Sequence, residues 1–184
     1  MSVLVDSPAT QAHSATWRPA LFVFVISSTL WLGSVFIRAM IGNVLLKFGT
    51  LTFEENIPPD AEREIFRLLS LTSLSVIGSY IIALVSSIVF LVTCPFKMKE
   101  HGWLMTSAIL FYLFVPIEAF TMYLDVRMIY GEFFTTADNQ VFRELFVARI
   151  GALAGTPYIA MLCYYTIIAL AVFQPLKKRL PQST

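Results

Sequence analysis

The sequence predicts an all-helical integral membrane protein, a bundle of four transmembrane helices joined by short loops. Hydrophobic residues make up 57% of the chain and charged residues 14%, whereas soluble domains average roughly 45–50% apolar and about 25% charged residues. Four apolar runs also approach the roughly 20 residues that a helix needs to cross a bilayer. The connections between these runs are too short to form a soluble domain, so function is expected in the bundle or in its partners.

The chain opens with small polar residues, and we expect a flexible tail over 1–16. Trp17 and Arg18 predict an interfacial start for a transmembrane domain over 17–176. The first span is expected over 20–46, as a retained helix, because no small-residue cleavage site follows its apolar run. Spacings of three and four residues predict a face toward the bundle that carries Ser27, Trp31, Ser34, Arg38 and Gly42. The opposite face is expected to meet lipid through Phe22, Val25, Leu32, Phe36 and Met40.

An amphipathic segment precedes the second span, which is expected over 72–93. Between Pro59 and Leu71 an apolar stripe lies opposite charged side chains, but the stripe is too short to cross a bilayer. This segment therefore predicts an interfacial helix at the membrane surface. Within the span, small residues suit close contact with another helix, and Gly78 is the smallest of them.

The third span is expected over 103–124, in an apolar run that Pro116 and Glu118 interrupt. Trp103 and Asp125 are expected at its two interfacial ends. An acidic side chain inside a span is costly unless it has a partner or a functional role. Glu118 is therefore a candidate functional residue.

A second amphipathic segment leads into the fourth span, which is expected over 150–173. Gly151 and Gly155 at the start of this span have the GxxxG spacing, so we expect them to face another helix. A basic tail over 177–184 ends the chain.

The two amphipathic segments resemble each other and suggest an internal repeat. Aligning residues 63–69 with 139–145 pairs Phe66 with Phe142, Arg67 with Arg143 and Leu69 with Leu145. A true duplication would relate two helix pairs by an axis along the membrane normal. The alternative is that two amphipathic lead-in segments are alike without common origin.

The loop charges predict that both termini lie in the cytoplasm, at a plasma or inner membrane. Lys97 and Lys99 lie in the short loop that would share the side of both tails, and the C-terminal tail is basic. Most acidic residues fall in the connections on the other side. Short loops rich in lysine and arginine favour the cytoplasmic side.

Arg38 and Glu118 are the two charged residues set most deeply in apolar sequence. They follow the starts of their spans by 38 − 20 = 18 and 118 − 103 = 15 residues, so their depths differ by roughly 5 Å. An unpaired charge at such depth costs about 2.5–3.5 kcal/mol, which suggests an ion pair between the two helices. This pair would fix helix register or form a proton or ion site; separate positions at the interface are the other alternative.

No cofactor or metal is expected, because the only histidines, His13 and His101, lie outside the spans and no cysteine cluster exists. Cys94 and Cys163 are expected to be small apolar residues. The net charge of +1 and the dispersed basic residues give no reason to expect nucleic-acid binding.

The remaining features favour a non-catalytic accessory or structural subunit of a larger membrane complex. Its partners would be the lipid bilayer and other membrane subunits, or further copies of the chain. Two alternatives depend on Glu118. The first is an oligomeric transporter or channel component that uses this carboxyl group for proton or ion coupling. The second is a lipid-modifying enzyme in which the group serves as an acid or base.

Overall fold

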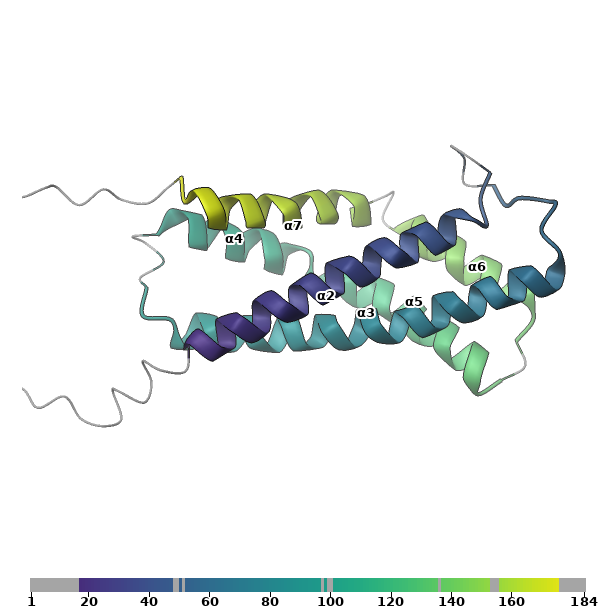
Figure 1. Ribbon diagram of the computed structural model, residues 1–184, viewed down its shortest axis with the longest axis horizontal. Coiled ribbons are helices and arrows are strands. Elements are labelled where there is room, and N and C mark those ends of the chain that lie inside the picture. The colour runs from purple at the N-terminus through teal and green to yellow at the C-terminus, as the bar shows by residue number, and fades with distance from the viewer. Residues whose placement is uncertain are drawn as a thin grey trace, which may run out of the picture. The chain divides into compact units, whose positions relative to one another are not determined.

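The computed structural model describes residues 17–47, 50, 52–96, 98, 101–135, 137–152 and 156–175. These residues form six helices (Figure 1): α2 (Trp17–Asn43), α3 (Pro59–Thr93), α4 (Gly102–Leu113), α5 (Val115–Phe133), α6 (Asn139–Ile150) and α7 (Thr156–Phe173). They contain no β-strand, only one isolated antiparallel bridge between Leu46 and Phe53. The predicted all-helical fold is confirmed, while both predicted tails lie outside the described residues.

Three helical stretches among the described residues are long and apolar enough to cross a membrane: Trp17–Asn43, Pro59–Thr93 and Gly102–Phe133. They contain or overlap the first three predicted spans. The helix in the predicted fourth span begins later than expected, since α6 ends at Ile150 and α7 runs over Thr156–Phe173. The apolar part of α7, Ile159–Phe173, is shorter than the other three stretches, so a fourth crossing stays a prediction.

The chain forms two compact units. Unit 1 comprises Met1–Pro95 and Met128–Phe142, and it therefore holds α2, α3, the end of α5 and the start of α6. Unit 2 comprises Phe96–Arg127 and Arg143–Thr184, and it holds α4, most of α5 and α6, and α7. Within unit 2, α4 packs against α7.

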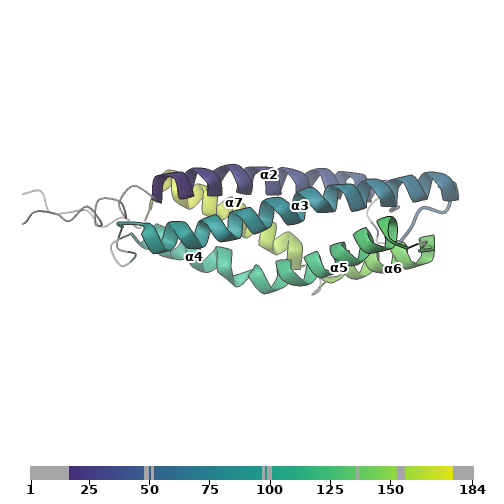
Figure 2. The ribbon, with the colours of Figure 1, turned by 90° about the horizontal axis from the view of Figure 1, so that it is seen from below.

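In unit 1, α2 and α3 run antiparallel and side by side (Figures 1 and 2). The Trp31 and Tyr80 rings meet at a centroid distance of 4.9 Å, and the hydroxyl groups of Ser34 and Ser75 lie 2.9 Å apart. The predicted inner face of α2 is confirmed at Ser27, Trp31, Arg38 and Gly42, the buried residues of the helix. Ser34, the fifth residue predicted on this face, is half-buried. The predicted outer face is largely exposed, at Phe22, Val25, Phe36 and Met40.

The segment between Pro59 and Leu71 is helical, as predicted, but it is not a separate surface helix. It forms the first turns of α3, a single helix of 35 residues that is about 52 Å long at about 1.5 Å per residue. This length exceeds the roughly 30 Å hydrocarbon core of a bilayer. The structure therefore replaces the predicted separate segment with the first turns of one continuous helix, which is longer than a single crossing needs.

Spin labels at Glu64 and Ile88 should distinguish these two arrangements of α3. Both side chains are exposed, and 88 − 64 = 24 residues of straight helix place the two backbone positions about 36 Å apart. A right-angled bend at Leu71 would shorten this separation to about 28 Å. We expect the longer distance by double electron–electron resonance, with both cysteines replaced beforehand. A distribution centred on the shorter distance would contradict the continuous helix.

The predicted third span is interrupted at Phe114, which separates α4 from α5. Pro116 explains the break: its nitrogen cannot donate to the carbonyl group of Tyr112, and its ring clashes with a helical carbonyl at that position. The amide of Phe114 bonds the Tyr112 carbonyl oxygen instead. The helix then restarts, and the Glu118 amide donates to the Phe114 carbonyl oxygen at 3.0 Å.

A cluster around Arg63 connects the start of α3 to the turn between α5 and α6 within unit 1. The Arg63 guanidinium lies 2.9 Å from the Glu132 carboxylate and donates to the Ala137 carbonyl oxygen at 2.8 Å. It also lies over the Phe142 ring, 4.6 Å from the centroid. Phe142 in turn stacks on Phe66 with a centroid distance of 5.4 Å.

Phe66 and Phe142 are also equivalent residues in the suggested internal repeat. In an arrangement with two-fold symmetry, residues near the axis contact their own counterparts. The stacked rings have this relationship, although the repeat itself stays a hypothesis.

Candidate functional site

Helix α5 carries three polar residues on one face: Glu118, Thr121 and Asp125. Spacings of three and four residues bring side chains to the same side of a helix. The break at Phe114 places Glu118 in the first turn of α5, where the free amide groups of a helix interact favourably with a carboxylate. Thr121 and Asp125 are both buried. Glu118 and Asp125, with Thr121 between them, form the acidic side of the candidate site, and all three residues belong to unit 2.

Arg149, at the end of α6, supplies the basic side. Its Nε donates to Oδ1 of Asp125 at 2.7 Å, a short distance typical of a charge-assisted hydrogen bond. The side chain of Asp125 is 0% exposed and that of Arg149 is 19% exposed. This ion pair connects the middle of α5 to the end of α6 and keeps the Asp125 carboxylate away from solvent.

Glu118 is the less enclosed of the two acidic side chains and has intermediate exposure. The Tyr164 hydroxyl group on α7 donates to its Oε1 at 3.4 Å, which is long beside the roughly 2.7–2.8 Å usual for such bonds. Tyr164 is held among apolar rings, with Phe111 and Phe114 each at a centroid distance of 6.1 Å. The site therefore combines one carboxylate that is paired with a cation through its Oδ1 with a second, loosely held one.

The residues of this site could serve two different roles, one structural and one chemical. The Asp125–Arg149 pair can fix the packing of α5 against α6, because breaking a buried pair leaves an uncompensated charge. The loosely held carboxyl group of Glu118 can exchange a proton or contact a cation. Among the residues that the structure describes, no three side chains of His, Cys, Asp or Glu come together to hold a metal ion.

The structure does not test the predicted pair between Arg38 and Glu118, because Arg38 belongs to unit 1 and Glu118 to unit 2. Arg38 is buried, and its Nη2 lies 3.6 Å from the sulfur of Met128, also in unit 1. The pair stays a prediction. The Asp125 side chain is buried, and its predicted depth at the membrane interface stays a prediction.

The glycines predicted to mediate helix packing give a mixed result. Gly155 lies outside the described residues. Gly151 lies in the turn after α6, and a Cβ atom there would meet only the Val147 carbonyl oxygen of its own chain, at 3.1 Å. A Cβ atom at Gly78 would meet no described atom within 4 Å. No described neighbour therefore packs closely at Gly78, and its predicted packing role stays a prediction.

The remaining predicted interfacial residues lie at helix starts. Trp17 and Arg18 begin α2, with the Arg18 guanidinium 5.4 Å from the centroid of the Trp17 ring. Trp103 is the second residue of α4. Their depth in a bilayer stays a prediction.

Sequence reasoning missed the role of Arg149, Tyr164 and Thr121 in the site. One signal was available, since Asp125 follows Glu118 by seven residues and must share its helical face. The partners on α6 and α7 carry no comparable signal, because their contacts depend on tertiary packing.

Fold and site together define an all-helical protein whose long apolar helices are compatible with several membrane crossings. Comparisons with protein-family models, with curated proteins and with solved structures found no match.

Proposed function

We propose that this protein is a non-catalytic accessory subunit of a larger membrane complex, with four crossings and both termini in the cytoplasm. The observation that carries this proposal is the buried ion pair between Asp125 and Arg149. The most enclosed carboxylate of the candidate site is already neutralised by a residue of the same chain. Such a pair is suited to holding two helices together rather than to catalysis or transport.

The serine residues of α2 and α3 support the same proposal. The hydroxyl groups of Ser27, Ser70, Ser73 and Ser86 each donate to a carbonyl oxygen four residues earlier in their own helix. Their polarity is therefore satisfied locally. Meanwhile large apolar side chains remain exposed along all three long stretches, as expected for surfaces that contact lipid or other membrane subunits.

Glu118 favours a second candidate function, proton or cation coupling in an oligomeric transporter. This proposal is based on its partial exposure and its long hydrogen bond to Tyr164. An ionisable group that faces the interior of a membrane protein is a default candidate for a proton pathway.

A flux measurement separates the two functions. The full-length protein is reconstituted into liposomes that contain a pH-sensitive dye, and a potassium diffusion potential drives proton entry. For an accessory subunit we expect the same flux from the wild-type protein, from Glu118→Gln and from protein-free liposomes. Flux that exceeds the protein-free level and disappears in Glu118→Gln would overturn the proposal in favour of transport. Glu64→Gln is the control, because this acidic residue is exposed on α3.

The accessory role also predicts stable association with other membrane subunits. After extraction in a mild detergent, the tagged protein should migrate with other membrane subunits in a fixed ratio. Migration of the chain alone, or as a homo-oligomer, would contradict the proposal.

A further inference from the structure

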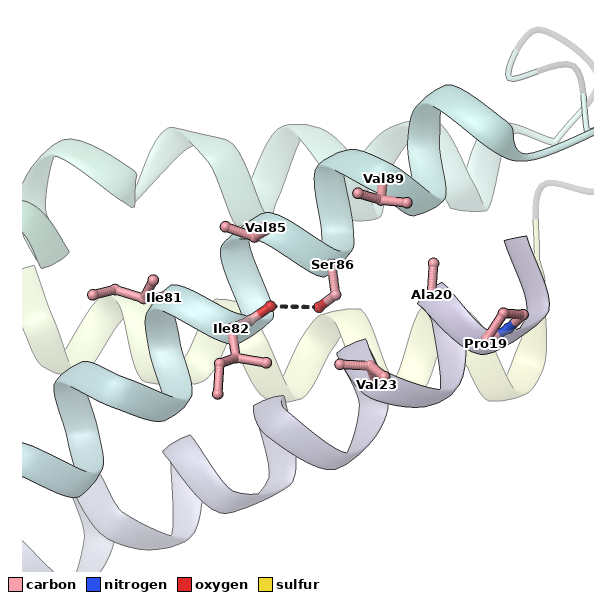
Figure 3. A pocket seen from close by; sticks show the side chains of 8 residues that line it. All are labelled: Pro19, Ala20, Val23, Ile81, Ile82, Val85, Ser86 and Val89. Carbon is pink, nitrogen blue, oxygen red and sulfur yellow. Dashed lines mark hydrogen bonds between the residues drawn. The ribbon is translucent and has the colours of Figure 1, made fainter. Parts of the chain in front are cut away.

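Two adjoining hollows form a furrow along the seam between α2 and α3, entirely within unit 1. The first has a volume of about 480 Å³ and begins at Pro19 and Ala20 (Figure 3). The second has a volume of about 400 Å³ and continues to Leu30. Val23 and Ile82 line both hollows, so the two hollows adjoin, and together they are called the α2–α3 furrow. Each volume falls in the roughly 300–1,000 Å³ range of ligand sites.

Small residues create the furrow, and its serines add little polarity to it. Ala20 and Gly78 leave space between the larger side chains that form the walls. The hydroxyl group of Ser86 donates to the Ile82 carbonyl oxygen at 2.6 Å (Figure 3). The three other serines of the furrow are also hydrogen-bonded within the protein: Ser27, Ser75 and Ser79. The furrow is therefore suited to hydrocarbon rather than to a polar ligand.

The length of the furrow argues against a transmembrane helix as its occupant. From Pro19 to Leu30 it follows 11 residues of α2, about 16 Å, and from Leu74 to Val89 it follows 15 residues of α3, about 22 Å. Both lengths fall short of the roughly 30 Å that a crossing helix covers. Along α2 the furrow matches about half of the hydrocarbon core, which is the depth of one leaflet.

A positive charge lies at the start of the furrow. Arg18 precedes Pro19 and lies one helical turn before Phe22, which lines the second hollow. Its side chain is exposed, and in the described part of the chain it forms a cation–π contact with Trp17 but no ion pair. Tryptophan and arginine at the end of an apolar helix are typical of the headgroup level of a membrane. This end of the furrow therefore suits an anionic headgroup.

We propose that the α2–α3 furrow binds an anionic phospholipid, with one acyl chain between the two helices and the headgroup phosphate against Arg18. The lipid belongs to the leaflet that contains the start of α2. This site does not depend on whether the protein is an accessory subunit or a transporter.

Titration of the purified full-length protein with single lipids, followed by native mass spectrometry, tests the site. The probes are dioleoylphosphatidylglycerol, which is anionic, and dioleoylphosphatidylcholine, which is zwitterionic. We expect the anionic lipid to bind about fivefold more tightly, because the attraction of one arginine for an anionic headgroup accounts for a factor of about this size. Arg18→Gln should remove this preference, because it should weaken binding of the anionic lipid more than binding of the zwitterionic lipid, whose phosphate charge is offset by its choline group.

Gly78→Leu tests the acyl-chain part of the site, because its side chain would occupy the furrow. Apart from the backbone of its own helix, no described atom lies within 4 Å of a Cβ atom at Gly78, and leucine is a better helix former than glycine, so the variant should fold. We expect weaker binding of both lipids. Gly33→Leu is the matched control, because Gly33 is equally open but does not line the furrow, and binding should be unchanged.

Three results would overturn the site. They are equal wild-type affinity for the two lipids, a preference that survives Arg18→Gln, or lipid binding that is unaltered in Gly78→Leu. A change in the number of protein chains per particle in Gly78→Leu, without a change in lipid binding, would instead identify the furrow as a contact between protein helices.

Discussion

Replacing Arg149 with glutamine is expected to lower the free energy of unfolding by about 3–5 kcal/mol, the usual cost of removing one partner from a buried ion pair. Asp125 is 0% exposed, so its carboxylate would remain buried without its counter-charge. Unfolding in mixed micelles with increasing denaturing detergent, followed by circular dichroism, measures the change.

The double variant Asp125→Asn/Arg149→Gln should recover part of this loss, because it removes both charges together. Lys47→Gln is the control for an exposed pair. Lys47 lies 2.8 Å from Glu55, with side chains 41% and 83% exposed, and this change should cost at most about 1 kcal/mol. Additive effects of the two changes at Asp125 and Arg149 would show that the pair does not stabilise the fold.

Phe142→Ala is expected to lower the free energy of unfolding by about 3–5 kcal/mol, as for other large side chains removed from a core. Phe142 is fully buried. It stacks on Phe66 and carries the Arg63 guanidinium on its ring, so the change removes packing from α3 and α6 together. The same mixed-micelle unfolding assay measures the loss.

Phe134→Ala provides the comparison, because this side chain belongs to the neighbouring turn but is 73% exposed. Its replacement should have a much smaller effect. A double-mutant cycle with Phe66→Ala should show non-additive losses, since the two rings are in contact. Equal losses at Phe142 and Phe134 would contradict the importance of the stacked pair.

Local sequence predicted the helical fold but few of the helix ends: those at Thr93 and Phe173 match, whereas α3 begins at Pro59 and not at residue 72. Apolar runs with few charges predict long membrane helices, and the spacing of Ser27, Trp31, Arg38 and Gly42 predicted the buried face of α2. Such patterns repeat with the helical period, so they can be read without knowing the neighbouring helix. Pro116 likewise marks the break between α4 and α5, because its effect on hydrogen bonding is local.

Tertiary structure decided which side chains meet. Sequence reasoning assigned Glu118 a partner by comparing depth along two spans, yet depth says nothing about which faces of two helices are adjacent. In the structure Arg149 contacts Asp125 and Tyr164 contacts Glu118. These contacts depend on the path of the intervening loops, which no periodic pattern in the sequence encodes. The structure also shows Pro59–Thr93 as one helix, where an amphipathic stripe suggested a separate element. Sequence by itself therefore determined the helical fold and the buried face of α2, because these depend on short-range periodicity. The polar site and the α2–α3 furrow required the tertiary structure, because they depend on how separate helices pack.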